Sequence, residues 1–194
     1  MDKVLLLVSI SILMATHLYA QDVGSSATSK GSFLIEVNTG FGEVSMANTS
    51  LIFRSGEGGE EWAAGGEAGY FVLDNLALKA GVGFSDLGGA DNVSGEFHWK
   101  LGAKYYVGGR FPVQIDLNGS RRTYGDDPDN NPDTPPVFTP NATPLWLGFQ
   151  GAYAWMIAKN VSVEPGLRYG ISLNDDADTI GSNFSFNLGF NVFL

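Results

Sequence analysis

The chain has 194 residues, of which 26 are glycine, 12% are aromatic and none is cysteine. This length suits one domain, and the lack of cysteine excludes both disulfides and a lipid anchor on cysteine. The net charge of −10 argues against nucleic acid as a partner, because the field of the chain would repel phosphate. Many glycines together with many aromatic residues suit a β protein with large rings on one face and small residues on the other.

The N-terminus predicts export. A charged start at Met1 to Lys3, an apolar run from Val4 to Met14 and a small residue at Ala20 are typical of a secretory signal peptide, which we place at residues 1–20. The apolar run is too short for a membrane-spanning helix, although an N-terminal anchor helix is the alternative. Residues 21–31 are rich in Ser, Gly and Thr and are expected to form a flexible lead-in. Residues 32–194 are expected to form the folded domain.

Eight segments alternate apolar residues with small or polar ones, at the period of two that is typical of β-strands. In chain order they span residues 32–42, 62–72, 76–84, 93–107, 111–119, 145–157, 161–173 and 183–194. The connections between them alternate long and short, and the short ones are residues 74–75, 108–110 and 158–160. This pattern predicts an all-β fold, an eight-stranded antiparallel up-and-down transmembrane β-barrel with its short turns on the periplasmic side.

The apolar face of these strands is expected to contact lipid. A soluble lipocalin-like barrel is the alternative, but its outer face would carry many long polar side chains, whereas the second face here is mostly Gly, Ala and Ser. Small residues with a few charges suit the narrow interior of an eight-stranded barrel. Trp146 and Met156 do not fit, because they lie in the polar phase. Pro165 does not fit either, since a closed barrel has no free edge, and we expect a bulge or a later strand start there.

The polar phase predicts a charged lumen. Five acidic and four basic residues, with one histidine, share this phase, and we expect the charges to be paired because unpaired charges are costly in a restricted interior. The predicted network consists of Glu36, Glu67, Lys79, Glu96, His98, Lys100, Lys104, Asp116, Glu164 and Arg168.

Three stretches carry a resemblance to a known family: residues 69–78, residues 164–170 and the closing strand from Asn183 to Leu194. The last also resembles the C-terminal signature by which outer-membrane barrels are recognised for insertion, with Leu194 in place of the usual Phe and Phe193 in the opposite phase. Residues 32–194 resemble the small OmpA/OmpX-like barrels, and most of all the "outer membrane protein beta-barrel domain" group of Bacteroidetes.

The resemblance implies an integral protein of the bacterial outer membrane in a Gram-negative cell, and the even number of expected strands puts both termini in the periplasm. It implies outer-membrane lipid and lipopolysaccharide as surroundings, the barrel-assembly machinery as a partner during insertion, and a monomer. Proteins of this type are commonly described as porin-like or of unknown role.

Few residues suggest chemistry. His98 could act as a base with Glu96 or Asp116 beside it, or it could be one more member of the interior network. Arg121 and Arg122 lie where the fifth strand leaves the membrane, and they are either lipid-phosphate contacts or ordinary rim charges.

One loop suggests a metal. Asp127, Asp129 and Asn131 space their oxygens as calcium loops do, but the glycine and the closing glutamate of such loops are missing, so a solvated acidic loop is the alternative.

The sequence therefore predicts a non-enzymatic outer-membrane barrel without a cofactor, which supports the envelope or displays acidic loops to an outside partner. The alternative function is a narrow porin-like channel for ions or small solutes. A lipid-modifying enzyme is a third class, and it would need a catalytic group at the outer rim.

Overall fold

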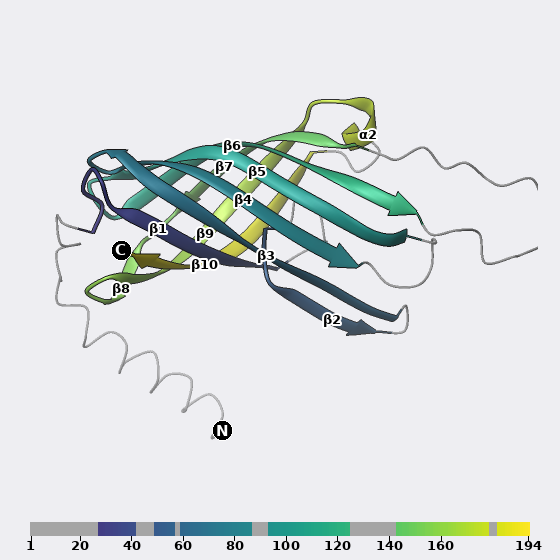
Figure 1. Ribbon diagram of the computed structural model, residues 1–194, viewed down its shortest axis with the longest axis horizontal. Coiled ribbons are helices and arrows are strands. Elements are labelled where there is room, and N and C mark those ends of the chain that lie inside the picture. The colour runs from purple at the N-terminus through teal and green to yellow at the C-terminus, as the bar shows by residue number, and fades with distance from the viewer. Residues whose placement is uncertain (1–26, 42–48, 57–58, 87–92, 125–142, 179–181) are drawn as a thin grey trace, which may run out of the picture.

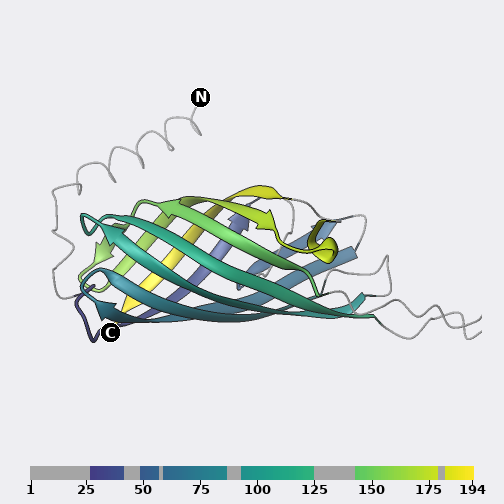
Figure 2. The ribbon, with the colours of Figure 1, turned by 90° about the horizontal axis from the view of Figure 1, so that it is seen from above.

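The computed structural model describes residues 27–41, 49–56, 59–86, 93–124, 143–178 and 182–194. These residues form an antiparallel β-barrel (Figures 1 and 2). The elements are β1 (Phe33–Phe41), β2 (Ile52–Gly56), β3 (Gly59–Leu73), β4 (Leu76–Asp86), β5 (Val93–Val107), β6 (Phe111–Tyr124), β7 (Leu145–Ala152), β8 (Trp155–Ala158), β9 (Val161–Ser172), α2 (Asp175–Asp178) and β10 (Asn183–Phe193). Within the described ranges, no helix is long and apolar enough to cross a membrane.

The barrel closes because β1 pairs on both of its edges. One edge pairs with β10, from Leu34 opposite Phe193 to Phe41 opposite Phe186, and the other pairs with β3 through residues 33–36. Strands β7 and β8 occupy one position in the wall, and β2 extends β3 as a hairpin, so the wall has eight positions. The predicted eight-stranded antiparallel barrel is confirmed.

The two ends of the barrel differ. We call the end with the connections 74–75, 108–110 and 159–160 the turn end, and the opposite end the loop end. The C-terminus lies at the turn end, on the left of Figure 1.

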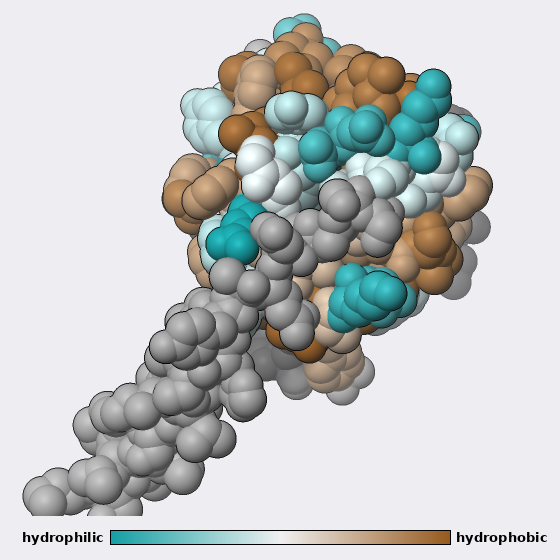
Figure 3. Space-filling model, turned by 90° about the vertical axis from the view of Figure 1, so that its left-hand side faces the viewer, coloured by the Kyte–Doolittle hydropathy of each residue, from teal (hydrophilic) through white to brown (hydrophobic). Residues whose placement is uncertain are grey.

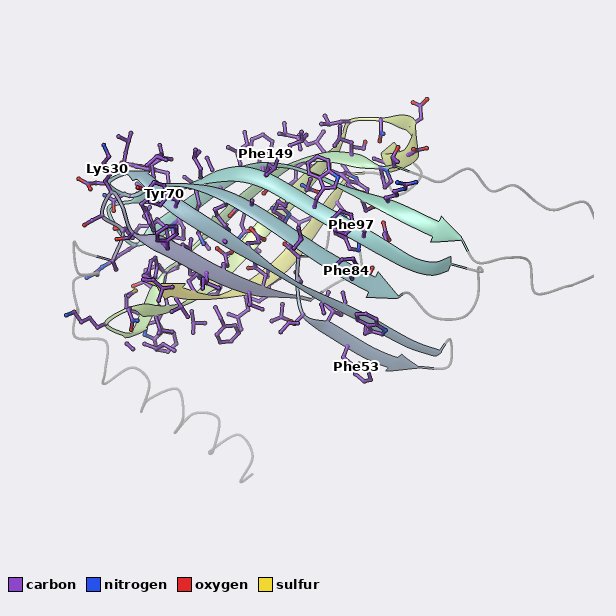
Figure 4. The ribbon with its side chains drawn as sticks, viewed as in Figure 1. Lys30, Phe53, Tyr70, Phe84, Phe97 and Phe149 are labelled. Carbon is purple, nitrogen blue, oxygen red and sulfur yellow. The ribbon has the colours of Figure 1, made fainter. Side chains whose placement is uncertain are left out.

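Burial alternates along the long strands of the wall, with polar residues inside and apolar residues outside. On β6, Phe111 is 56% and Ile115 is 47% exposed, whereas Asp116 is 2% exposed. Large apolar side chains project from the wall all around it, among them Tyr70, Phe84, Phe97 and Phe149 (Figure 4). A water-soluble protein shows the opposite distribution, and an apolar band around a polar lumen is the surface of a transmembrane barrel.

Some boundaries differ from those predicted. Residues 43–61 were expected to be a connection, but β2 lies within them and pairs with the start of β3, from Ile52 opposite Ala63 to Gly56 opposite Gly59. Strand β6 continues to Tyr124 rather than ending at residue 119, and α2 forms inside the expected loop 174–182. These additions lie at the loop end. There the strands continue beyond the residues that alternate apolar with polar side chains, and the prediction relied on that alternation.

Pro165 is accommodated in a way that we did not predict. Strand β9 runs through it without a break, and the interruption falls in the neighbouring strand, between β7 and β8. The backbone N–H of Tyr153 donates to the carbonyl of Pro165 at 3.0 Å. Because the N and O atoms of one strand residue face the same side, the proline nitrogen faces the interrupted strand, and the ladder between β9 and β10 runs on through Pro165.

The described part of the expected lead-in, residues 27–31, is held against the turn end. Thr28 accepts a backbone hydrogen bond from Asn75 at 2.7 Å, and its hydroxyl donates to the side-chain oxygen of Asn75 at 2.7 Å. The N–H of Gly31 donates to the carbonyl of Phe71 at 2.8 Å. Residues 27–31 are therefore hydrogen-bonded to the turn end of the barrel.

Candidate functional site: the charged interior of the barrel

The centre of the lumen holds an alternating chain of acids and bases. Five ion pairs join six side chains in the order Glu164, Lys104, Glu36, Lys79, Glu67 and Lys100, with N–O distances of 2.5, 2.7, 2.6, 2.8 and 2.6 Å. All six side chains are buried. They come from β1, β3, β4, β5 and β9, so the chain of charges ties together strands from opposite sides of the barrel. We call it the ion-pair chain.

Strand register explains why the ion-pair chain needs Lys79. Glu36 and Glu67 are direct partners in the ladder between β1 and β3. Two carboxylates placed opposite one another destabilise a sheet unless a cation is shared between them. The ammonium group of Lys79 contacts both, at 2.6 and 2.8 Å, and the amide of Asn38 donates to both, at 3.0 and 3.2 Å.

A sixth ion pair lies beside the ion-pair chain. Arg168 donates two hydrogen bonds to the two oxygens of Asp116, at 2.7 and 2.6 Å, which is the paired geometry that favours arginine over lysine. Gly148 lies between β6 and β9 at this level, and a Cβ atom there would collide with the guanidinium group of Arg168. The missing side chain at Gly148 is what leaves room for the pair.

Gln114 connects the two groups of charges. Its oxygen accepts from Lys79 at 2.8 Å and its amide nitrogen donates to Asp116 at 2.9 Å. The connected groups contain four acids and four bases, so their charges balance. Charges taken out of water are stable only when each has its partner, and removing one partner from such a pair costs about 3–5 kcal/mol.

The remaining two members of the predicted network lie toward the loop end. The ring Nε2 of His98 is 2.7 Å from the hydroxyl of Ser85, and the hydroxyl of Ser120 donates to Glu96. Both His98 and Glu96 are buried. The structure therefore places all ten predicted residues in the interior, with Arg168 half-buried and the other nine buried.

An apolar cluster closes the turn end of the lumen. It consists of Leu34, Phe71, Ala77, Tyr106, Ala154 and Phe193, with Ala27 and Met156 packed against it. We call it the turn-end cap. The rings of Phe71, Tyr106 and Phe193 contact one another with centroids about 6 Å apart.

Tyr106 links the turn-end cap to the ion-pair chain. Its hydroxyl donates to Glu164 at 3.0 Å, and the ammonium group of Lys104 lies 5.4 Å from its ring centroid. The cap also explains two features of the sequence. Phe193 and Met156 lie in the polar phase because inward-facing positions near the turn end line a closed, apolar end of the lumen.

Sequence reasoning missed several interior residues. Thr49 lies in a segment predicted to be a connection, yet it is fully buried, donates to Glu67 at 2.6 Å and accepts from Lys100 at 2.9 Å. Gln114 and Asn38 lie in the polar phase of their strands, but the predicted network contained only charged residues and histidine, so their hydrogen bonds to the charged side chains were not predicted. Trp146 is fully buried inside, opposite Asn118 and Ser172 in the ladders.

The other predicted sites are only partly described. Arg121 is exposed on the outer face, opposite Phe97 in the ladder, and Arg122 lies opposite Glu96. Asp127, Asp129 and Asn131 lie outside the described residues, so the calcium loop stays a prediction. In the part of the chain that the structure describes, no cluster of three His, Cys, Asp or Glu side chains that could hold a metal ion occurs.

Comparisons with known proteins add the following. No protein-family model matches the chain, so the Bacteroidetes group stays a prediction, and no curated protein matches by sequence. Among solved structures, the N-terminal barrel of Pseudomonas aeruginosa OprF is 14% identical, with a TM-score of 0.49 over 85% of this chain and 98% of that one. Yersinia pestis Ail is 9% identical, with a TM-score of 0.48 over 85% and 100%. Neisserial surface protein A is 12% identical, with a TM-score of 0.45 over 85% and 99%.

Proposed function

We propose that this chain is a non-enzymatic integral protein of the bacterial outer membrane, whose lumen is closed and whose role is to support the envelope or to display its acidic loops. Outer-membrane lipid with lipopolysaccharide surrounds it, and the barrel-assembly machinery inserts it. The observation that carries the proposal is the filling of the lumen by the ion-pair chain and the turn-end cap.

The closure has two layers of different chemistry. In the ion-pair chain, side chains from five strands contact one another across the lumen, and each is no more than 8% exposed. The turn-end cap lies between the ion-pair chain and the turn end, and its three aromatic rings fill the lumen there. A solute would have to break buried ion pairs and then displace packed rings, and both are costly.

Planar-bilayer recording on refolded protein tests this proposal. We expect no steady conductance above that of the lipid alone. Insertion is measured separately, by the shift in electrophoretic mobility between heated and unheated samples, so a silent bilayer is not mistaken for a failed insertion. Steady conductance from inserted protein would contradict the closed lumen and favour the porin-like channel.

Location is tested in the cell. An epitope placed in the loop-end connection 125–142 is expected to be reached by antibody on intact bacteria, whereas an epitope at the C-terminus is not. The reverse result, or recovery of the chain with the soluble fraction, would contradict the proposed placement.

A further inference from the structure

Three basic side chains stand around the turn end, each on a different segment. Lys30 precedes β1, Arg110 lies in the turn before β6, and Lys159 lies in the turn before β9. Lys30 and Lys159 are exposed and Arg110 is half-exposed. In the part of the chain that the structure describes, no carboxylate forms an ion pair with any of them. Figure 3 looks onto this end and shows polar residues on the end face with apolar residues around its edge.

The outward aromatic rings give the depth of these cations. Phe33 and Tyr70 form a ring pair with centroids 5.1 Å apart, close to Lys30 at the turn end (Figure 4). Phe111, which follows Arg110, forms another pair with Tyr153 at 5.5 Å. Aromatic rings on a membrane barrel collect at the boundary between hydrocarbon and headgroups. On the proposed membrane placement, Lys30 and Arg110 lie just beyond these rings, at the depth of lipid phosphates.

The loop end has the opposite charge. Its connections, residues 42–48, 57–58, 87–92, 125–142 and 174–182, contain acidic residues and no basic ones: Glu43, Glu57, Asp91, Asp126, Asp127, Asp129, Asp133, Asp175, Asp176 and Asp178. At the turn end, by contrast, the exposed acid among the described turn residues is Asp74, and its carboxylate accepts from the backbone N–H of Lys30 at 2.8 Å. The connections of the turn end therefore carry exposed cations, whereas those of the loop end carry acids.

We propose that Lys30, Arg110 and Lys159 form a basic rim that binds the headgroups of anionic phospholipids in the leaflet around the turn end. The inference rests on the proposed membrane placement. Separate segments place the three cations around the barrel, so the rim contacts several lipids rather than one. Basic side chains near a membrane surface attract anionic lipid, and salt weakens this attraction.

The test uses the protein refolded in vesicles that contain phosphatidylcholine and phosphatidylglycerol. Electron paramagnetic resonance of spin-labelled lipids measures the relative association of the two headgroups with the protein. The variant is Lys30→Gln with Arg110→Gln and Lys159→Gln, and the matched control keeps the charges, with Lys30→Arg and Lys159→Arg. We expect about a twofold preference of the wild type for phosphatidylglycerol at low salt, kept in the control and lost in the triple variant.

Equal association of both headgroups with the wild type, or an undiminished preference in the triple variant, would overturn the basic rim while leaving the barrel in place. Failure of the wild type to insert into these vesicles would overturn the proposed membrane placement and the rim together. The heated and unheated mobility measurement separates these two results.

Discussion

Replacement of Lys79 by methionine removes the central cation of the ion-pair chain while keeping an unbranched side chain of similar length. Lys79 contacts Glu36 at 2.6 Å, Glu67 at 2.8 Å and Gln114 at 2.8 Å. In the variant, Glu36 keeps Lys104 and Glu67 keeps Lys100, but the two facing carboxylates no longer share a cation. The ion-pair chain then carries one uncompensated negative charge inside the barrel.

The expected loss in the free energy of unfolding is about 3–5 kcal/mol, which is typical when one partner of a buried pair is removed. A second substitution, Glu67→Gln, removes the surplus negative charge. It leaves two acids and two bases in the ion-pair chain, so the double variant is expected to be less destabilised than the sum of the single ones, by about 1–3 kcal/mol.

The assay is reversible urea unfolding of the refolded protein in lipid vesicles, followed by tryptophan fluorescence. Lys159→Met, at an exposed turn position, is the matched control and is expected to change the unfolding free energy by less than about 0.5 kcal/mol. A loss below about 1 kcal/mol for Lys79→Met, or strict additivity in the double variant, would show that the buried charges are not coupled as the distances indicate.

The same assay checks three further expectations. Gly148→Ala should cost about 1–3 kcal/mol because its Cβ would meet Arg168, whereas Gly151→Ala, with open space around it, should cost almost nothing; equal effects would contradict the packing argument. Tyr106→Phe should cost about 1–3 kcal/mol through the lost hydrogen bond to a buried carboxylate, and an unchanged stability would show that this bond contributes nothing. Phe193→Ala should cost about 3–5 kcal/mol because Phe193 fills the turn-end cap. Leu194→Ala, at a residue that is 65% exposed, should cost clearly less, and the reverse order would contradict the inward placement of Phe193.

The path of the chain near Thr49 shows why part of the interior was hidden from sequence reasoning. Strand β1 pairs with β3 only up to Glu36, and beyond it Asn38 bridges to Ser50. The chain therefore returns toward the barrel after β1 and places Thr49 beside Glu67 before β2 begins. Residues 43–61 show too little alternation of apolar and polar residues to predict that Thr49 faces the interior, because one inward side chain does not make a periodic pattern.

Pro165 shows the same limit from another direction. Its conflict with a closed sheet was visible in the sequence, and we expected either a bulge at Pro165 or a later start of its strand. The structure instead accommodates Pro165 through the neighbouring strand, which is interrupted between β7 and β8. The interrupted strand directly precedes β9 in the chain and pairs with it, so the solution depends on how these two strands align.

The alternation of side chains determined which residues line the lumen, because the period of two is a local property of the extended chain. It placed Glu36, Lys79 and Lys104 on one face and the apolar residues on the other, and the strand count followed from the turns. Which charges meet was decided only by the tertiary structure. Register and tilt place Glu36 opposite Glu67, set Lys79 between them and bring Glu164 to Lys104, and these depend on how the whole sheet closes on itself.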